Sequence, residues 1–542
     1  MTTVESAAGA AKASERRLCW AIFLCVFSSY MLSSSREIPW SDARLIYEVA
    51  ESLVTRGELD VSVRWPASLP LGKDGKIYAA APLLQSLVHV PGVTVARMLG
   101  KLFPGTAGWS RPFSAHVGPS ALAAWACVFL FVICRRMGGS IGAALLASLT
   151  AAFTTMLWVY ARYPYAEALQ AACFMGLVYQ LLRTRDAPTG RNGLFLGVAA
   201  GLLLAAKPVY AASIAGAAVY LLVYLRRRPR DLLRLVPPGI IGMLPSIALV
   251  IFYNYLRWGA LGATGYTGSE DIPMFPERVA VGLWGIFLAP GKSAFLYSPA
   301  LLLSAWGLPR FVRRRPGEAL AILLTAGPTI LVTAKLLFWA GDWAWGPRYL
   351  VFALPALLAP ACLVFDDLRW QVVPLRRVLA RAAVAVVLLW GVGVQFIGNA
   401  FYWDHWIRLS KQARDAWLNV PNRTGSWTGI DPEGCGACFE DMHPLQWLPP
   451  FQPIEGHWWL LKHVPFGDNW YEAEGDAPWR RYTTMRLNVA DGYARARVDW
   501  WFLDYAKGHL AEGLAIMVLM LGGVAGSTAV LVREYRRLVD GR

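Results

Sequence analysis

Asp42 is the carboxylate whose surroundings point most directly to chemistry. Ser41 before it is a typical helix N-cap and Gly57 is a typical residue after a helix end, so the sequence predicts a helix between them. The apolar residues of this segment recur on one helical face: Leu45, Ile46, Val49, Leu53 and Val54. Such a helix lies on a membrane surface, where the Asp42 carboxylate could accept a proton from a substrate hydroxyl. An acidic residue in a first turn also complements the helix dipole, which is the structural alternative for Asp42.

Further charged and aromatic residues are expected at the same membrane surface. Lys76 and Tyr78 are delivered by a tight turn at residues 73–76, and Arg162 and Glu167 stand at the outer mouth of an apolar stretch. Other such residues end or join apolar stretches: Lys207, Tyr266, Lys292, Arg348 and Tyr349. Charged groups so close to a bilayer are costly unless they are paired or used. A solvated turn and an interfacial aromatic belt are the structural alternatives for the turn and the tyrosines.

The composition is that of a membrane protein. Apolar residues make up 56% of the 542 residues, charged residues make up 16%, and the mean hydropathy is +0.40. Soluble domains average roughly 25% charged residues. Apolar stretches long enough to cross a bilayer predict an all-α polytopic membrane protein with about 12 transmembrane helices.

The placement of the basic residues indicates orientation. The net charge of +16 could point to nucleic acid, but Lys and Arg cluster after every second predicted span, as they do in cytoplasmic loops. Anionic lipid headgroups are therefore the expected partners of these clusters, and no nucleic acid is expected. Both chain ends are predicted to be cytoplasmic. The Arg-rich short loops and the lack of an organellar signal are compatible with a bacterial inner membrane.

The predicted orientation changes the structure expected for two apolar stretches. Counting residues 82–102 as a span would turn every later basic cluster outward, so this stretch is predicted to be a helix in the outer interface. Residues 193–225 must form a hairpin, because basic clusters flank both of its ends. Its first arm, residues 193–206, would rise only about 21 Å, which is less than the roughly 30 Å hydrocarbon core. Lys207 is therefore expected below the outer surface, inside the protein.

The chain is predicted to have three parts. Residues 1–400 form a transmembrane catalytic module, with residues 33–113 as a first external loop that carries the amphipathic interfacial helices. Residues 401–509 are rich in Trp and Pro and predict a small external domain, mixed α/β or β-rich. Residues 510–542 form the last transmembrane helix and a cytoplasmic tail.

The predicted external domain carries the residues that could form a disulfide or hold a metal. Alternating residues at 483–489 and 493–500 predict strands. Cys435 and Cys438 form a Cys-Gly-Ala-Cys sequence, for which a local disulfide is favoured over a redox motif that would need a βαβ context. Most of the histidines fall in this domain, but no cluster has a recognisable ligand spacing. No cofactor is assigned, and a divalent metal ion stays open.

An ordered set of motifs covers residues 18–365. Asp42 lies on an amphipathic helix in the first external loop, and Glu167 lies in the second. The other motifs are Gly75-Lys76-Ile77-Tyr78 before the interfacial helix, the glycine-spaced stretch 197–208 that ends in Lys207-Pro208, residues 287–293, and Gly346-Pro347-Arg348-Tyr349-Leu350. Taken in order, this set resembles the GT-C superfamily of membrane glycosyltransferases, in particular the protein O-mannosyltransferases and the lipid A aminoarabinose transferase.

The resemblance implies inverting sugar transfer from a polyprenyl-phosphate donor to an acceptor hydroxyl on the periplasmic face of the membrane. A carboxylate of the first external loop is the general base in this family, and that role falls to Asp42. Fixed cations must stabilise the leaving lipid phosphate, and the candidates are Arg162, Lys207, Lys292 and Arg348. Lys76, Tyr78, Tyr266 and Tyr349 complete the expected substrate-binding residues. Several family members place a second acid next to the base, whereas Ala43 follows Asp42 here, so a second acid would have to come from Glu167.

Other functions share the predicted helices and buried charges. A lipid-linked-sugar flippase or transporter would usually show internal repeats, which we do not find. A polysaccharide ligase or polymerase with a diphosphate-linked donor would favour a large external loop, and residues 401–509 could be that loop. A structural or receptor-like role of the external domain is a third alternative. For a transferase, the acceptor is open between a glycan, a lipid and a protein.

Overall fold

The computed structural model describes residues 2–39, 41–61, 71–263, 265, 275, 278–336, 338–341, 344–370, 373–407, 410, 446–463, 469–470, 495–496, 498–503 and 510–540. Nearly all of the regular structure in these residues is helical. Two short strands, β1 (Asn469–Trp470) and β2 (Arg495–Ala496), pair antiparallel.

The helices follow one another along the whole chain. In the first half they are α1 (Thr2–Leu32), α2 (Asp42–Arg56), α3 (Leu83–Leu87), α4 (Val90–Leu102), η1 (Pro104–Thr106), α5 (Ala107–Arg136), α6 (Ile141–Phe153), α7 (Leu157–Ala161), α8 (Glu167–Asp186), α9 (Gly190–Ala206), η2 (Pro208–Tyr210), α10 (Ala211–Leu225) and α11 (Pro229–Trp258). In the second half they are α12 (Val279–Leu288), α13 (Ala294–Tyr297), α14 (Leu301–Arg314), α15 (Pro316–Ala334), η3 (Arg348–Ala353), α16 (Leu354–Leu357), α17 (Ala361–Trp370), α18 (Pro374–Ala400), η4 (Pro449–Phe451), α22 (Pro453–His463) and α24 (Leu510–Asp540).

Several of these helices are long and apolar enough to cross a membrane. Within the described residues there are six such stretches: Ser110–Arg136, Pro208–Leu225, Pro229–Trp258, Pro316–Ala334, Pro374–Ala400 and Ala511–Val539. The pair Arg348–Leu357 and Ala361–Leu368, bent by 41°, makes a seventh if it is one span. The protein is therefore an all-helical polytopic membrane protein, as predicted, with fewer long spans than the about 12 that apolar length suggested.

Part of the difference arises from breaks within predicted spans. Residues 141–160 were expected to form one helix but divide into α6 and α7, where the Thr154 and Thr155 hydroxyls donate to backbone carbonyls four residues earlier at 2.6 and 2.7 Å. Residues 294–312 divide into α13 and α14 next to Pro299, which cannot donate a helical hydrogen bond. The arm α9 has 17 residues and ends at Lys207, as the predicted hairpin requires.

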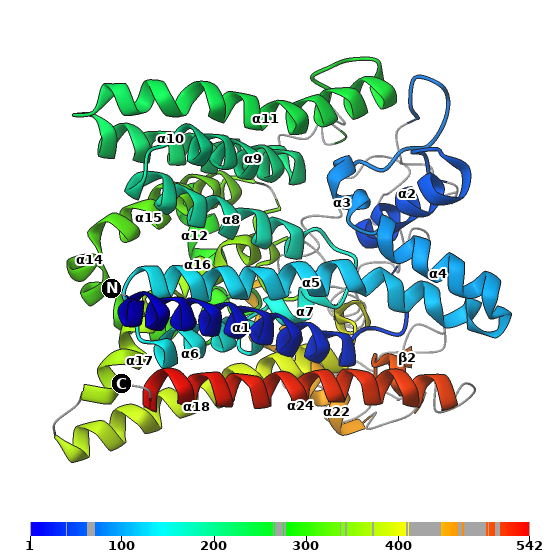
Figure 1. The fold of residues 1–542 in the computed structure, drawn as a ribbon. Coiled ribbons are helices and arrows are strands. Elements are labelled where there is room, and N and C mark those ends of the chain that lie inside the picture. Colours follow the sequence, from blue (N-terminus) through cyan, green and yellow to red (C-terminus); the bar gives the residue numbers. More distant parts are fainter. Residues whose placement is uncertain are drawn as a thin grey trace.

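Figure 1 shows the long helices side by side, with both chain ends at one end of them and α2, α3 and α4 at the opposite end. The first and last helices, α1 and α24, pack along each other. The two termini therefore share one side, as the basic clusters predict; the compartment that this side faces stays a prediction. Residues 82–102, predicted as one interfacial helix, form α3 and α4 with a break at residues 88 and 89.

Helices α9 and α11 pack with their backbones in close contact. A Cβ atom added to Gly197 of α9 would lie 1.9 Å from the carbonyl oxygen of Gly239 in α11. A Cβ atom on Gly242 of α11 would lie 2.3 Å from the carbonyl oxygen of Leu194. Small residues allow membrane helices to approach in this way. The glycine spacing therefore fixes α9, and with it Lys207 at its end, against the neighbouring span.

The described part of residues 401–509 contains no β domain. It holds η4, α22 and the two-residue strands β1 and β2, so the predicted mixed α/β or β-rich domain is not confirmed there. The predicted strand at 483–489 lies outside the described residues. Of the predicted strand at 493–500, only Arg495–Ala496 is described as a strand, and residues 498–500 are irregular.

Candidate active site

Asp42 is held at the start of α2 by a defined cap. It is the first residue of the helix, and its side chain is 67% exposed. The Ser41 Oγ accepts the backbone N–H of Ala43 at 3.3 Å, which satisfies one of the unpaired donors of the first turn. Arg111 of α5 donates to Glu48 of α2 at 2.9 Å and ties the helix to the transmembrane part. The predicted interfacial helix thus presents Asp42 on a fixed support.

Tyr165 joins the two loops that were predicted to be external. Its hydroxyl donates to Ser41 Oγ at 2.8 Å and lies 3.0 Å from the hydroxyl of Tyr402. Ser41 directly precedes Asp42, and Tyr165 lies just before Glu167, the first residue of α8, whose side chain is only 7% exposed. This contact brings an exposed carboxylate and a buried carboxylate to the same site.

Arg348 lies between these two carboxylates. Its guanidinium is 3.5 Å from Asp42 Oδ2 and 3.7 Å from Glu167 Oε1. The backbone before it is held by Lys292, whose Nζ donates to the carbonyls of Ala344 at 2.7 Å and Gly346 at 3.3 Å. Lys292 is buried, so the structure gives this predicted phosphate ligand a place beneath the loop that carries Arg348.

Lys207 adds a second cation from the end of α9. Its ammonium lies 4.6 Å from the centre of the Tyr349 ring, and the Arg348 guanidinium lies 5.2 Å from the same ring. Lys207, Arg348 and Asp42 all act electrostatically on the Glu167 carboxylate. The structure therefore brings together five of the predicted site residues, which come from α2, α8, the end of α9 and η3.

The charges in this cluster are close but not tightly bonded. Charge-assisted hydrogen bonds between Arg and a carboxylate usually measure about 2.7–2.9 Å, shorter than both contacts of Arg348. Among the described residues, Glu167 Oε2 and Arg348 Nε are buried and have no hydrogen-bond partner. Buried polar atoms without partners are rare in folded proteins and call for an explanation. The cluster thus offers a ligand unused hydrogen-bonding capacity beside loosely paired charges.

Lys76 and Tyr78 lie in a separate charged group of the loop between α1 and α5. The Lys76 ammonium donates to Glu58 at 2.8 Å, which holds the pKa of that carboxyl below its ordinary value. The Tyr78 hydroxyl donates to Asp74 at 2.8 Å and likewise keeps the pKa of Asp74 low. Both predicted binding residues are thus engaged within their own loop.

The remaining predicted site residues have other places. Arg162 is fully buried and pairs with Asp499 at 3.1 Å. Tyr266, Cys435 and Cys438 lie outside the described residues, so the predicted tyrosine contact and the predicted disulfide stay predictions. No group of His, Cys, Asp or Glu that could hold a metal ion occurs in the part of the chain that the structure describes.

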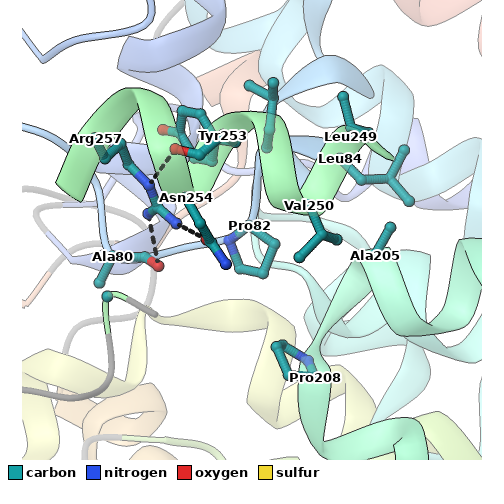
Figure 2. Close-up of a pocket in the computed structure, with 12 residues that line it drawn as sticks. Ala80, Pro82, Leu84, Ala205, Pro208, Leu249, Val250, Tyr253, Asn254 and Arg257 are labelled. Atoms are coloured by element: carbon teal, nitrogen blue, oxygen red, sulfur yellow. Dashed lines mark hydrogen bonds between the residues drawn. The ribbon is translucent and has the colours of Figure 1, made fainter. Parts of the chain in front are cut away.

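A small pocket with a mostly apolar lining lies beside the Lys207 turn and has a volume of about 20 Å³. Figure 2 shows it between the interfacial segment, the end of α9 and α11, with these apolar lining residues: Pro82, Leu84, Ala205, Pro208, Leu249 and Val250. Leu83 also lines it. At its polar end Arg257 donates to the carbonyls of Ala79 at 2.7 Å and Ala80 at 3.2 Å. Gln85 of α3 donates to the carbonyl of Ala206 at 2.6 Å, which fixes the interfacial helix beside Lys207.

Comparison with known proteins gives a likeness of fold. No family model and no curated protein matches the sequence. The structure is similar to ArnT from Cupriavidus metallidurans bound to undecaprenyl phosphate, with a TM-score of 0.44 and 16% identity over 81% of this chain and 76% of that chain. It is also similar to the archaeal oligosaccharyltransferase AglB from Archaeoglobus fulgidus in complex with an inhibitory peptide and a dolichol-phosphate, with a TM-score of 0.41 and 12% identity over 74% of this chain and 58% of that chain.

The chain is structurally similar to these two solved proteins. At these identities the likeness concerns the arrangement of helices alone. The chemistry of this chain therefore has to be argued from its own residues.

Sequence reasoning did not identify Ser41, Tyr165 and Asp499 as parts of the site or its support. Ser41 was recognised only as a cap. The hydrogen bond between Ser41 and Tyr165 joins residues 124 positions apart, and Asp499 lies 337 positions from Arg162. No local spacing connects residues so distant in the chain.

Proposed function

We propose that the protein transfers a sugar from a polyprenyl-phosphate donor to an acceptor hydroxyl. The transfer takes place on the outer face of the membrane that the protein spans. The acceptor oxygen attacks the anomeric carbon while the bond from that carbon to the phosphate oxygen breaks, and the configuration inverts. Asp42 takes the proton of the hydroxyl as the new glycosidic bond forms. The lipid phosphate leaves with the electron pair of the broken bond.

The position of Arg348 between two carboxylates is the observation that carries this proposal. Asp42 is exposed, so an acceptor hydroxyl can reach its carboxylate. Glu167 is buried, so its carboxylate is suited to hold a cation in place. The contacts of Arg348 at 3.5 and 3.7 Å are long, so phosphate oxygens can approach the guanidinium without displacing a strong hydrogen bond. A guanidinium matches two phosphate oxygens at once.

Lys207 supports the same reaction as a second phosphate cation. It stands on the Tyr349 ring beside Arg348 and interacts electrostatically with Glu167. Negative charge grows on the leaving phosphate in the transition state, and cations already fixed in place stabilise that charge without reorganising. Glu167 balances part of this positive charge before the donor binds.

A small apolar pocket lies between the interfacial segment and α11, and its volume of about 20 Å³ is too small to enclose the prenyl chain of the donor. Its lining is mostly aliphatic, and Ala205 and Pro208 flank Lys207 on either side in the chain. A prenyl chain that lies in the bilayer against this apolar surface would therefore bring its phosphate close to Lys207. Burial of its apolar surface would contribute roughly 25 cal/mol per Å².

Incubation of the purified protein in proteoliposomes with radiolabelled polyprenyl-phosphate sugars tests the proposal. We expect cleavage of the sugar–phosphate bond, with release of the lipid phosphate and transfer of the label to an acceptor. Movement of intact labelled lipid across the bilayer without cleavage would instead indicate a flippase. Cleavage confined to diphosphate-linked donors would indicate the ligase alternative. Either result would contradict the proposed function.

A further inference from the structure

Asp499 is a buried carboxylate that the proposed reaction does not use. It is 2% exposed, and both of its carboxylate oxygens accept hydrogen bonds. Oδ1 accepts from the Ser35 hydroxyl at 2.8 Å and from the backbone N–H of Arg36 at 3.4 Å. Oδ2 accepts from the Tyr163 hydroxyl at 2.6 Å and from the Arg162 guanidinium at 3.1 Å.

These donors come from the two loops that carry the site carboxylates. Ser35 and Arg36 belong to the segment that leads from α1 to Asp42. Arg162 and Tyr163 belong to the segment that leads from α7 to Glu167. One carboxylate oxygen serves each loop, so Asp499 is a common acceptor through which the two loops are held at a fixed spacing.

The segment around Asp499 is itself anchored to the transmembrane helices. The backbone N–H of Asp499 donates to the carbonyl of Ala400 at 2.8 Å, at the end of α18. The Trp501 indole donates to the carbonyl of Met31 at 2.8 Å, near the end of α1. Arg162 also donates to the carbonyls of Asn399 and Asp499. The last described residues before α24 are thus bonded to α1, to α18 and to both loops.

We propose that Asp499 is a positioning residue that sets the distance between Asp42 and the Glu167–Arg348 pair. This inference rests on the proposed function. In a buried site a carboxylate bonded to hydroxyls, a backbone N–H and a guanidinium has one strongly preferred arrangement of its partners, because loss of any one leaves a polar group unsatisfied. The short segment that carries Asp499, residues 498–503, thereby controls the geometry of a site to which it contributes no reacting group.

Hydrogen–deuterium exchange of the full-length protein in Asp499→Asn tests the physical part of the proposal. We expect faster exchange in both residues 33–41 and residues 162–166. Glu318→Gln is the matched control, because Glu318 forms a similar ion pair with Arg185 at 3.0 Å at the other end of the helices. Unchanged exchange in both loops of Asp499→Asn would overturn the proposal.

Two further variants remove one donor each without leaving Arg162 unpaired. They keep the test valid if Asp499→Asn does not fold. Ser35→Ala should increase exchange in residues 33–41 alone, and Tyr163→Phe should increase it in residues 162–166 alone. Equal exchange changes in both loops for both variants would show general destabilisation and would contradict a two-sided acceptor.

Sugar transfer and prenyl-phosphate binding distinguish positioning from loss of the site. Lys292 holds the backbone before Arg348, and α9 holds Lys207, so neither cation depends on Asp499. The Kd of Asp499→Asn for undecaprenyl phosphate should therefore stay within about twofold of the wild-type value. Its kcat for sugar transfer should fall tenfold or more. A wild-type kcat in a folded Asp499→Asn protein would overturn the proposal even though the proposed function stands. Absence of transfer in the wild type would contradict the proposed function, and the exchange experiment would still decide whether Asp499 holds the loops.

Discussion

In the proposed reaction, Arg348 is the residue on which the binding of phosphate depends most. Its planar guanidinium can meet two phosphate oxygens, whereas a lysine ammonium is a single point of charge. Arg348→Lys should therefore keep the protein folded and lower kcat/KM for the donor by roughly tenfold to a hundredfold, equivalent to about 1.4–2.7 kcal/mol. Arg310→Lys is the control, since Arg310 forms an ion pair with Asp367 away from the cluster. A kcat/KM as high as that of the wild type would show that Arg348 does not bind the donor phosphate.

Lys292 is the residue that fixes the backbone before Arg348. Lys292→Met keeps the length of the side chain but removes the donor to the carbonyls of Ala344 and Gly346, which costs about 1–3 kcal/mol when a buried acceptor loses its partner. We expect a lower melting temperature in detergent and weaker binding of undecaprenyl phosphate. Lys101→Met, at an exposed position of α4, should change neither. If Lys292→Met bound prenyl phosphate as tightly as the wild type, Lys292 would not be needed to position Arg348.

Single residues also show where prediction from sequence succeeds. The helix that begins at Asp42 was predicted because its N-cap, its apolar face and its C-terminal glycine are local sequence patterns. The structure has this helix, α2, from Asp42 to Arg56. Lys207 was predicted to follow a short helix, and α9 ends at Ala206 directly before it, while the depth of Lys207 below the membrane surface stays a prediction. Arg162 was expected to face phosphate, but Asp499 is its partner in the structure, and nothing near either residue in the sequence announces that pair.

At the scale of elements, the contact of α9 with α11 positions Lys207. Gly197→Ala would place a methyl group against the Gly239 carbonyl, so α9 has to move and the melting temperature should fall by an amount corresponding to about 1–3 kcal/mol. Transfer should fall with it, because Lys207 moves with the helix. Gly526→Ala in α24 has nothing within 4 Å of the added atom and should be neutral or slightly stabilising. Equal effects of the two substitutions would contradict this packing argument.

The junction of α3 and α4 should make the stability of the interfacial helices depend on pH. His89 is buried there against the Tyr47 ring, and burial lowers its pKa to about 4. An unfolded histidine has a pKa near 6.5, so between these values the unfolded chain binds more protons. The contribution of His89 to the free energy of unfolding is then fully present above about pH 6.5. It is lost as the pH decreases towards 4, by about 3 kcal/mol in total. Melting curves of His89→Gln should lack this part of the pH dependence; parallel curves for variant and wild type would contradict it.

At the scale of the whole molecule, the class of the protein followed from composition and charge, and the number of spans did not. Apolar length alone cannot reveal that Thr154 and Thr155 interrupt one predicted span or that Pro299 interrupts another. It also cannot reveal which distant segments meet. The cluster of Asp42, Glu167, Lys207 and Arg348 forms because helices from four parts of the chain end at one place, and that arrangement is a property of the complete bundle.

Transfer by Asp42→Asn is the measurement that tests the proposed mechanism most directly. The amide keeps the shape of the carboxylate but cannot take the acceptor proton, so we predict a folded protein that binds undecaprenyl phosphate and loses at least a hundredfold in transfer from a radiolabelled polyprenyl-phosphate sugar. Glu512→Gln, another acidic residue in the first turn of a helix, should transfer at the wild-type rate. Full activity of Asp42→Asn would contradict the account, because the carboxylate would then serve only the helix dipole.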